Sequence, residues 1–256
     1  MSTKNGKNLN QLLFNWQRGT VYTQSYLSKM GYYHDLVKSY RRNNWLESLG
    51  GGAYKLAGDT IDLPGGVHTL QQQLNLPIHI GGRTALEMGG YAHYARFGRN
   101  KCFLFTTEII RLPRWFSNYT WEMDIQFKTS NMFPPGMETG FTKYKHKDFT
   151  VKISAPERAC MEMLYYVPGM QGFDEALKIM ENLPNLRPGI VQELLENCNL
   201  IKVKRLFLFM AEKTNAPWLN ELNQDRVNLG KGKRSIVTNG HFNKKYQITI
   251  PGENEY

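Results

Sequence analysis

Hydrogen-bond donors recur at helical spacing between residues 33 and 44. These donors are the side chains of His34, Lys38, Arg41 and Arg42. At 100° per residue they share one side of a helix. The apolar positions that share the other side are Tyr33, Leu36, Val37 and Tyr40. Such a face suits a recognition helix, because base edges and phosphates lie across it in the major groove of DNA. The alternative is a solvated charged face.

Residues at the two ends of this helix have different expected roles in DNA binding. Tyr33 or His34, near its start, could reach base edges, whereas Arg41 and Arg42, near its end, are suited to holding phosphates. The segment therefore predicts a DNA-contacting face with both kinds of contact.

Local signals place this helix third in a series. A first amphipathic helix, which stops before Arg18, is predicted by the spacing of Leu9, Leu12, Leu13 and Trp16. Thr23 is a candidate N-cap of a short second helix that Gly31 ends. Segments 45–49 and 53–57, joined by three glycines, predict a two-stranded hairpin. Three short helices followed by a hairpin are typical of a winged helix-turn-helix.

The glycine-rich segment "SLGGGAYK" has two possible interpretations. A phosphate-cradling P-loop needs Gly-Lys-Ser/Thr at the start of a helix, and this segment has no such sequence. A wing tip fits better, because its glycines would let the backbone approach DNA closely. Lys55 would then be available to a phosphate.

Charge is unevenly distributed along the 256 residues, whose net charge is +10 and whose pI is near 9.4. Residues 1–58 carry eight basic and two acidic side chains, and residues 200–246 carry ten and three. A strongly basic balance favours a polyanionic partner.

The second basic region is a further candidate surface. Its cations are Lys202, Lys204 and Arg205 at the start of a helix, and Lys231, Lys233 and Arg234 in the turn "LGKGKR". They could form a second nucleic-acid surface or be solvated charge. The segment "IKVKRLFLFMAE" is apolar nearly all round, which predicts a buried helix.

Other candidate sites have weaker patterns. In "HIGGRTALEMGGYAHY", Gly81, Gly82, Arg83 and Thr84 could hold an anion at a helix N-terminus, but a structural turn is favoured. His79 and His93 lack a metal-ligand spacing.

Acidic residues on predicted strands are a further candidate for chemistry. Glu122, Asp124, Asp148 and Lys152 lie on strand-like segments, as a metal-dependent nuclease needs, but such spacing arises often by chance. No catalytic residue, metal or cofactor is expected, and the prediction is that the protein is not an enzyme.

Cys102, Cys160 and Cys198 are odd in number and widely spaced, which argues against disulfides and favours a reducing cytoplasm. The N-terminal apolar run is too short for a signal sequence or a membrane span. We therefore expect a soluble, unexported protein with no membrane partner.

The sequence beyond Gly58 changes to a mixture of helices and strands. The predicted domains are 1–58, a winged helix-turn-helix, and 59–256, so the fold class is α+β with a larger mixed α/β C-terminal domain. Strands are predicted at "LPIHI", "KCFLFTT", "WEMDIQFKTS" and "FTVKIS", followed by helices after Ala155. Asn239-Gly240 predicts a tight hairpin, although the strands that it would join are uneven.

The order of these motifs resembles the AbiEi-type antitoxins of type IV, abortive-infection toxin-antitoxin systems. The resemblance covers almost the whole chain. It rests on "YLSKMGYYHDLVKSYRRNNWLESLGGGAYKLAGD", "HIGGRTALEMGGYAHY", "LPRWF", "APERACMEMLYYVP", "IKVKRLFLFMAE", "LGKGKR" and "KYQITIP".

The resemblance implies a bacterial autorepressor whose winged helix binds its own operator. If single domains bind weakly, two copies on an inverted repeat would add affinity by linkage on one DNA, which predicts palindromic half-sites. The resemblance also implies a C-terminal domain required for antitoxin activity against a nucleotidyltransferase-like toxin, without a stable complex. The DNA-facing elements would carry His34, Lys38, Arg41, Arg42 and Lys55, and the C-terminal motifs the six basic residues given above. Only the resemblance, and no composition or spacing, supplies the antitoxin role.

Overall fold

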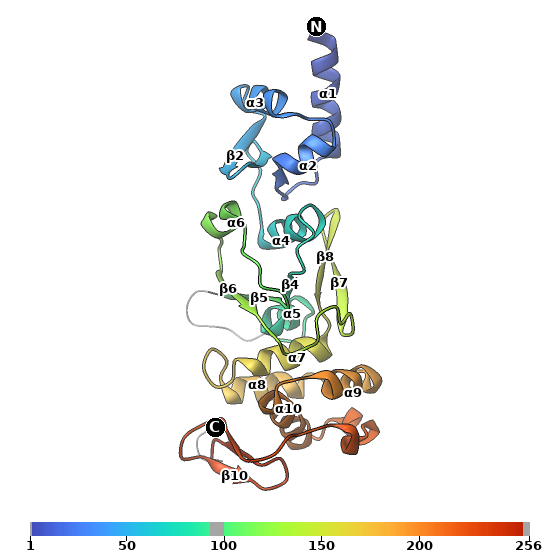
Figure 1. The fold of residues 1–256 in the computed structure, drawn as a ribbon, viewed down its shortest axis with the longest axis vertical. Coiled ribbons are helices and arrows are strands. Elements are labelled where there is room, and N and C mark those ends of the chain that lie inside the picture. The colour runs from blue at the N-terminus through green and yellow to red at the C-terminus, as the bar shows by residue number, and fades with distance from the viewer. Residues whose placement is uncertain (1, 93–99, 253–256) are drawn as a thin grey trace. The chain divides into compact units, whose positions relative to one another are not determined.

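The protein is described by a computed structural model over residues 2–92 and 100–252 (Figure 1). The chain divides into two compact units. The first unit is Met1–His79, Ile109–Asp124 and Lys143–Lys152, and the second is Ile80–Glu108, Ile125–Thr142 and Ile153–Tyr256. The first unit includes chain beyond Gly58, and a domain boundary at that residue stays a prediction.

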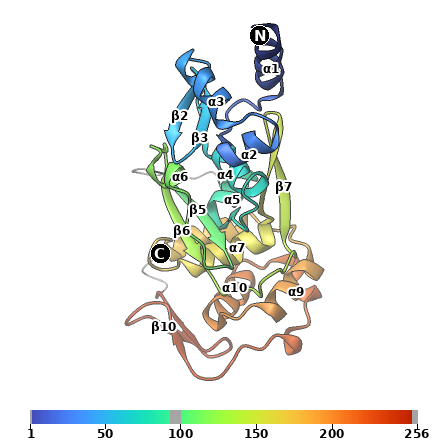
Figure 2. The ribbon, with the colours of Figure 1, turned by 45° about the horizontal axis from the view of Figure 1, so that its top comes forward.

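The N-terminal part of the first unit is a winged helix-turn-helix. Its elements are α1 (Ser2–Asn15), β1 (Tyr22–Thr23), α2 (Gln24–Lys29), α3 (His34–Arg42), β2 (Leu46–Gly50) and β3 (Ala53–Leu56). The strands form an antiparallel sheet of order β1-β3-β2. Figure 2 shows α3 beside the β2–β3 hairpin, which is the wing. The helices and the hairpin predicted from periodicity are thus confirmed.

The core of this module is built from the predicted apolar stripes. Leu12 of α1, Trp16 just after it, Leu27 of α2, and Val37 and Tyr40 of α3 are all buried in one cluster. Tyr33 was wrongly predicted to belong to this stripe, since 69% of it is exposed. It is the N-cap of α3 and has an extended backbone, so its side chain does not follow the helical register.

The first unit also contains α4 (Leu63–Gln72) and α6 (Arg114–Asn118). Asp62 caps α4, because its Oδ1 accepts a hydrogen bond from the Gly65 N–H at 2.9 Å. Gly65 has no room for a side chain, since a Cβ there would lie 1.8 Å from the Gly19 carbonyl oxygen. The chain of the winged helix and the start of α4 are therefore in direct contact.

A five-stranded sheet has the order β6-β5-β4-β8-β7, in which β4 and β8 are parallel. Its strands are β4 (His79–Ile80), β5 (Lys101–Thr106), β6 (Asp124–Thr129), β7 (Phe141–His146) and β8 (Phe149–Ser154). Each of the four predicted strand segments contributes one strand, and β7 was not predicted. The short helix α5 (Gly82–Met88) follows β4.

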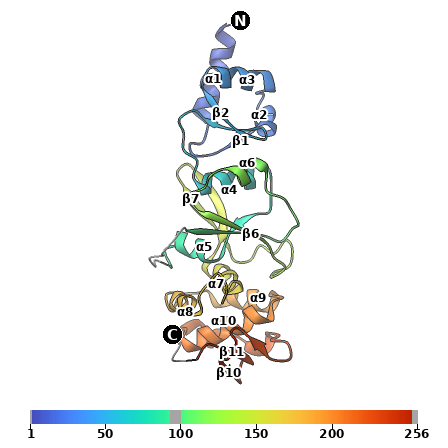
Figure 3. The same cartoon turned by 90° about the vertical axis from the view of Figure 1, so that its left-hand side faces the viewer.

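Helices dominate the second unit, as Figure 3 shows. They are α7 (Pro156–Tyr165), α8 (Phe173–Glu181), α9 (Pro188–Asn197) and α10 (Ile201–Lys213), followed by 3-10 turns at Pro217–Glu221 and Gln224–Arg226. Helix α10 packs against α7, α8 and the C-terminal sheet. Nine consecutive residues of α10, from Val203 to Ala211, are buried, which confirms the predicted buried helix.

The C-terminal sheet contains β9 (Arg234–Ser235), β10 (His241–Asn243) and β11 (Ile248–Ile250). Strand β11 pairs antiparallel with β10 and parallel with β9. The predicted tight hairpin at Asn239-Gly240 is therefore wrong, because the segments on its two sides pair with β11 and not with each other. The absence of a side chain at Gly240 instead allows the chain to pass close to β11, since a Cβ there would lie 2.0 Å from the Ile250 carbonyl oxygen.

The molecule is thus α+β, with an N-terminal winged helix-turn-helix and a larger mixed α/β C-terminal domain. In the part of the chain that the structure describes, no helix is long and apolar enough to cross a membrane.

Candidate nucleic-acid interface

The turn between α2 and α3 fixes the orientation of the recognition helix. Thr23 caps α2, with its Oγ1 accepting a hydrogen bond from the Tyr26 N–H at 3.3 Å. Gly31 ends the helix at φ +89°, a left-handed conformation that glycine adopts without strain. The next N–H, of Tyr32, then bonds to the Leu27 carbonyl at 2.8 Å. Both residues identified from the sequence have the predicted roles.

The exposed face of α3 carries the donors predicted from the sequence. His34, Lys38, Arg41 and Arg42 are all exposed, and Tyr33 stands exposed at the start of the helix. The guanidinium of Arg41 lies 5.8 Å from the centre of the Tyr54 ring on β3, which links helix to wing. Asp35 also lies on α3, and one of its carboxylate oxygens is 3.9 Å from His34 Nδ1. The helix therefore presents long donors to solvent over its whole length.

The wing tip is built from Gly50, Gly51 and Gly52, all with positive φ. The Gly52 carbonyl accepts a hydrogen bond from the Gln24 N–H at 2.6 Å, which ties the tip to the start of α2. This tip has no side chains, so a partner could approach its backbone closely.

Lys55, the lysine predicted to contact phosphate, is engaged within the protein. Its Nζ lies 2.9 Å from Glu47 Oε2 and donates to the Asp59 carbonyl at 2.7 Å, and only 17% of its side chain is exposed. The Gly58 N–H and Lys55 together lower the pKa of Glu47. Contact with a phosphate would require Lys55 to exchange these partners.

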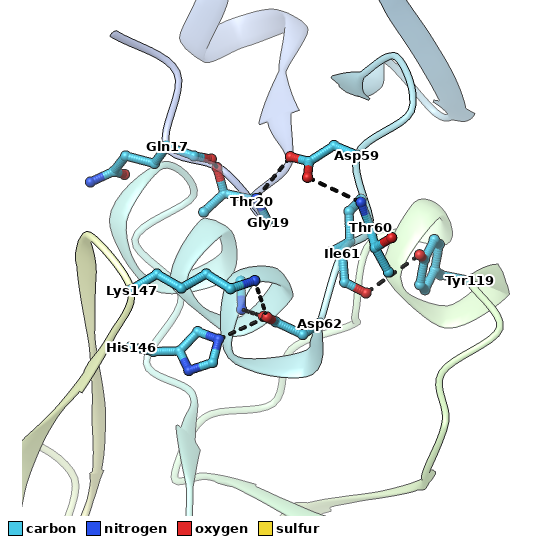
Figure 4. Close-up of polar contacts among 11 residues, drawn as sticks. Gln17, Gly19, Thr20, Asp59, Thr60, Ile61, Asp62, Tyr119, His146 and Lys147 are labelled. Atoms are coloured by element: carbon cyan, nitrogen blue, oxygen red, sulfur yellow. Dashed lines mark hydrogen bonds and ion pairs between the residues drawn. The ribbon is translucent and has the colours of Figure 1, made fainter. Parts of the chain in front are cut away.

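Polar contacts anchor the winged helix within the first unit (Figure 4). The Gly19 N–H donates to Asp59 Oδ2 at 2.8 Å. Asp62 Oδ2 lies 2.7 Å from both His146 Nε2 and Lys147 Nζ, at the turn between β7 and β8. Burial acts to raise the pKa of Asp62, but hydrogen bonds from Lys147 and His146 outweigh it and hold that pKa below its usual value. Residues distant in sequence thus hold the segments around Gly19 and Asp62, which adjoin the winged helix, in place.

Two of the C-terminal basic residues do not form a surface. Lys204 and Arg205 are only 3% and 1% exposed, so their prediction as part of an exposed basic patch is wrong. Lys204 Nζ donates to the Asn228 carbonyl at 3.2 Å. Arg205 donates to the carbonyls of Leu229, Gly230, Gly232 and Gln247, at 2.6–3.2 Å. These cations satisfy backbone carbonyls inside the second unit, which a solvated patch could not do.

The turn that Arg205 organises carries the rest of the predicted patch. Lys231, Lys233 and Arg234 are exposed, and Lys233 Nζ lies 5.0 Å from the centre of the Phe242 ring. Lys202 is half-buried, with its ammonium bonded to the carbonyls of Tyr165 and Val167. The six residues therefore divide into three that are exposed and three that hold the backbone.

The weaker anion site at residues 81–84 is filled by the protein itself. Glu162 is buried, and its Oε2 accepts hydrogen bonds from the Gly82 N–H at 3.0 Å and the Ser154 hydroxyl at 2.7 Å. A Cβ on Gly81 would lie 2.1 Å from the same oxygen. The glycines thus admit an internal carboxylate. His79 is buried, and His93 lies outside the described residues.

The structure also places the remaining ionisable candidates. Among the described residues, no group of three or more His, Cys, Asp or Glu side chains could hold a metal ion, and this includes Glu122, Asp124 and Asp148. The three cysteines are free and buried, and burial raises the pKa of Cys102 to about 12 and that of Cys198 to about 11. Such thiols are protonated and poor nucleophiles at neutral pH.

A winged helix with an exposed basic helix, followed by a larger α/β domain, has the architecture of a two-domain transcriptional regulator. Comparison with family models agrees with this class. Residues 5–97 match the AbiEi antitoxin N-terminal domain, and residues 99–251 match the AbiEi antitoxin of type IV TA systems, both described as transcriptional regulators. The chain belongs to this AbiEi antitoxin family of transcriptional regulators.

Among solved structures, the chain is similar to the crystal structure of the RV2827C protein from Mycobacterium tuberculosis. The TM-score is 0.59 at 13% sequence identity, over 97% of this chain and 91% of that chain. This likeness shows a shared fold across both parts of the chain. No curated protein matches the sequence.

Proposed function

We propose that the protein binds the operator of its own operon through residues 1–58 and represses that operon. In this proposal α3 enters the major groove, with Tyr33 or His34 near base edges and Arg41 and Arg42 on phosphates. The observation that carries the proposal is the division of α3 into two sides. His34, Lys38, Arg41 and Arg42 are exposed, whereas Val37 and Tyr40 are buried.

Two copies that contact each other on an inverted repeat would gain affinity, because binding of the first raises the effective concentration of the second. We therefore propose palindromic half-sites in the operator. The setting is the bacterial cytoplasm, and the protein acts by binding and not by catalysis. Metal-dependent cleavage of the operator that is lost in Asp148→Ala would contradict this.

The test is binding to the DNA upstream of the operon, against scrambled DNA of equal length, over a salt series. We expect preference for the operator and a log-log salt slope of about −4 to −7, for roughly five to eight neutralised phosphates. Equal, weak binding to both DNAs would overturn the assignment of α3 as a reader.

The antitoxin role has a finer form that we also propose. Family membership supports neutralisation of a toxin, and we infer that this toxin is a nucleotidyltransferase and that no stable complex with it is required. We propose that contact with nucleic acid or protein is made by the exposed cations Lys231, Lys233 and Arg234.

Co-expression with the toxin tests this proposal. We expect wild-type protein to rescue growth without co-purifying the toxin, and substitution of all three cations by alanine to impair rescue. Full rescue of growth by the triple variant would show that these three cations are only solvated surface charge. Co-purification of the toxin would show that neutralisation occurs by direct binding and would contradict our mechanism.

A further inference from the structure

The second unit contains a cavity of about 780 Å³. Its walls come from β6, the chain that follows α7, the first turn of α10, and Arg234. Binding sites for small molecules commonly have volumes of about 300–1,000 Å³. The cavity is therefore large enough for a ligand the size of a nucleotide, and much larger than a single inorganic anion requires.

Three cations line this cavity, and they come from separate parts of the chain. They are Lys128 on β6, Lys202 on α10 and Arg234 on β9. No Asp or Glu occurs among the described residues that line the cavity. Because like charges gathered in one place repel each other, the cavity is electrostatically complementary to an anion with several charges.

Lys202 is held in place at the cavity wall. Its ammonium donates to the Tyr165 carbonyl at 3.3 Å and also to the Val167 carbonyl. An ammonium has three N–H donors, so one remains for a ligand. Burial lowers the pKa of Lys202, as expected for a cation moved out of water with no carboxylate beside it. An anion in the cavity would compensate that desolvation.

Aromatic side chains form another part of the same wall. Phe127, Tyr165 and Tyr166 line the cavity. Lys128 Nζ lies 5.2 Å from the centre of the Tyr165 ring, so a cation and an aromatic surface adjoin each other. Aromatic rings stack on nucleic-acid bases with little regard to sequence, while neighbouring cations hold the phosphates.

We propose that this cavity binds a nucleoside phosphate, with the phosphates on Lys128, Lys202 and Arg234 and the base against the aromatic wall. Cations alone would accept any polyanion, and the aromatic wall alone any flat apolar molecule. A nucleoside phosphate combines both features within one ligand of this size. The proposal does not depend on operator binding by α3.

The experiment is calorimetric titration of the full chain with ATP and GTP. We expect saturable binding of one nucleotide per chain, and weaker binding of adenosine and of inorganic tripolyphosphate, each of which keeps one half of the ligand. A 5′-triphosphorylated RNA trinucleotide tests whether the ligand is the end of an RNA and not a free nucleotide. Binding of either ligand supports the site. Failure of all three nucleotide probes to bind at millimolar concentration would overturn the proposal.

Variants locate the site. Lys128→Ala combined with Arg234→Ala should weaken nucleotide binding at least tenfold. Lys244→Ala is the control, because it removes an exposed cation from the second unit without touching the cavity. An equal loss in control and double variant would show general charge attraction and overturn the site. Chemical denaturation of the same samples reports the folding of the second unit, and it keeps this result separate from the test of α3.

Discussion

The cations of α3 face solvent, whereas those at the start of α10 lie within the second unit. Both segments are rich in lysine and arginine, and sequence composition does not distinguish them. Their phase does. On α3 the donors at 34, 38, 41 and 42 keep to one side, opposite buried Val37 and Tyr40. On α10, Lys202, Lys204 and Arg205 span about 160° at 100° per residue, and the buried residues Leu208 and Phe209 lie within the same sector.

This difference has a physical consequence for α10. Because buried apolar residues lie on every side of α10, the cations of its first turn share their side of the helix with residues that pack in the core. The fold accommodates Arg205 by surrounding its guanidinium with four backbone carbonyls. Burial, and next the charge of Arg234, lower the pKa of Arg205, as expected for a cation that has carbonyls and no carboxylate for partners. A basic segment thus indicates an interface only when its cations lie on a side of the helix that carries no buried apolar residue.

The largest expected effect comes from Arg205→Ala. The substitution leaves four buried carbonyls without their donor, so the free energy of unfolding of the second unit should fall by about 3 kcal/mol or more. Chemical denaturation measures this change, and Lys231→Ala in the same region should stay within about 0.5 kcal/mol of wild type. If the unfolding free energy of Arg205→Ala falls as little as that of the control, the buried cation of α10 contributes no more to stability than an exposed one, which would contradict the comparison with α3.

On the α3 side, Arg41→Ala should act on binding and leave the fold intact. We expect operator affinity to fall about tenfold and the salt slope to lose about one phosphate contact. The unfolding free energy should fall by no more than about 0.5–1 kcal/mol, for the lost contact with Tyr54. Lys244→Ala, which removes an exposed cation from the second unit, is the control. Unchanged affinity in Arg41→Ala would show that this face is merely solvated.

Acid should weaken the two units to different extents. Glu157 is 1% exposed, and although burial acts to raise its pKa, hydrogen bonds from Arg187 hold that pKa below its usual value. Since the folded pKa is depressed, the stability from this carboxylate is present above its unfolded pKa of about 4.3 and is lost as pH falls through the folded pKa. Asp62 follows the same sign but is 31% exposed, which weakens its contribution.

The measurement for this prediction is the free energy of unfolding at pH 7 and at successively lower pH. Glu157→Gln should flatten the pH dependence more than Asp62→Asn does. The reverse order would mean that the contacts of Asp62 in Figure 4 contribute more stability than the ion pair between Glu157 and Arg187.

The smallest effect is expected for Lys55→Ala. Its ammonium is already bonded to Glu47 and Asp59, so operator affinity should change less than in Arg41→Ala. Loss of the partly exposed ion pair should cost the first unit up to about 1 kcal/mol. The same titrations and denaturation curves test both statements, and a loss of affinity equal to that of Arg41→Ala would place Lys55 on the DNA.

Much of the winged helix was predictable, and the residues show why. The cap at Thr23, the turn at Gly31 and the glycine tip of the wing depend on backbone preferences of single residues and their immediate neighbours. Tyr33 was misplaced, because helical periodicity does not apply to a residue whose backbone is still extended.

The cavity of the second unit gave no such local signal. Lys128 lies on a strand among alternating polar residues, and nothing in its neighbourhood marks it as part of a site. It meets Lys202 and Arg234 only because distant segments fold together. The role of Glu162 was not predicted for the same reason. Its carboxylate accepts a hydrogen bond from the Gly82 N–H, which lies 80 residues away in the sequence.

The sequence by itself determined the elements of the winged helix and the exposed basic side of α3, because apolar periodicity and short-range hydrogen bonds act within a few residues. The tertiary structure alone decided which groups the buried cations bond to. The carbonyls that bind Arg205 come from residues 24 to 42 positions further along the chain. Burial of a charge depends on such distant partners, and no local pattern encodes them.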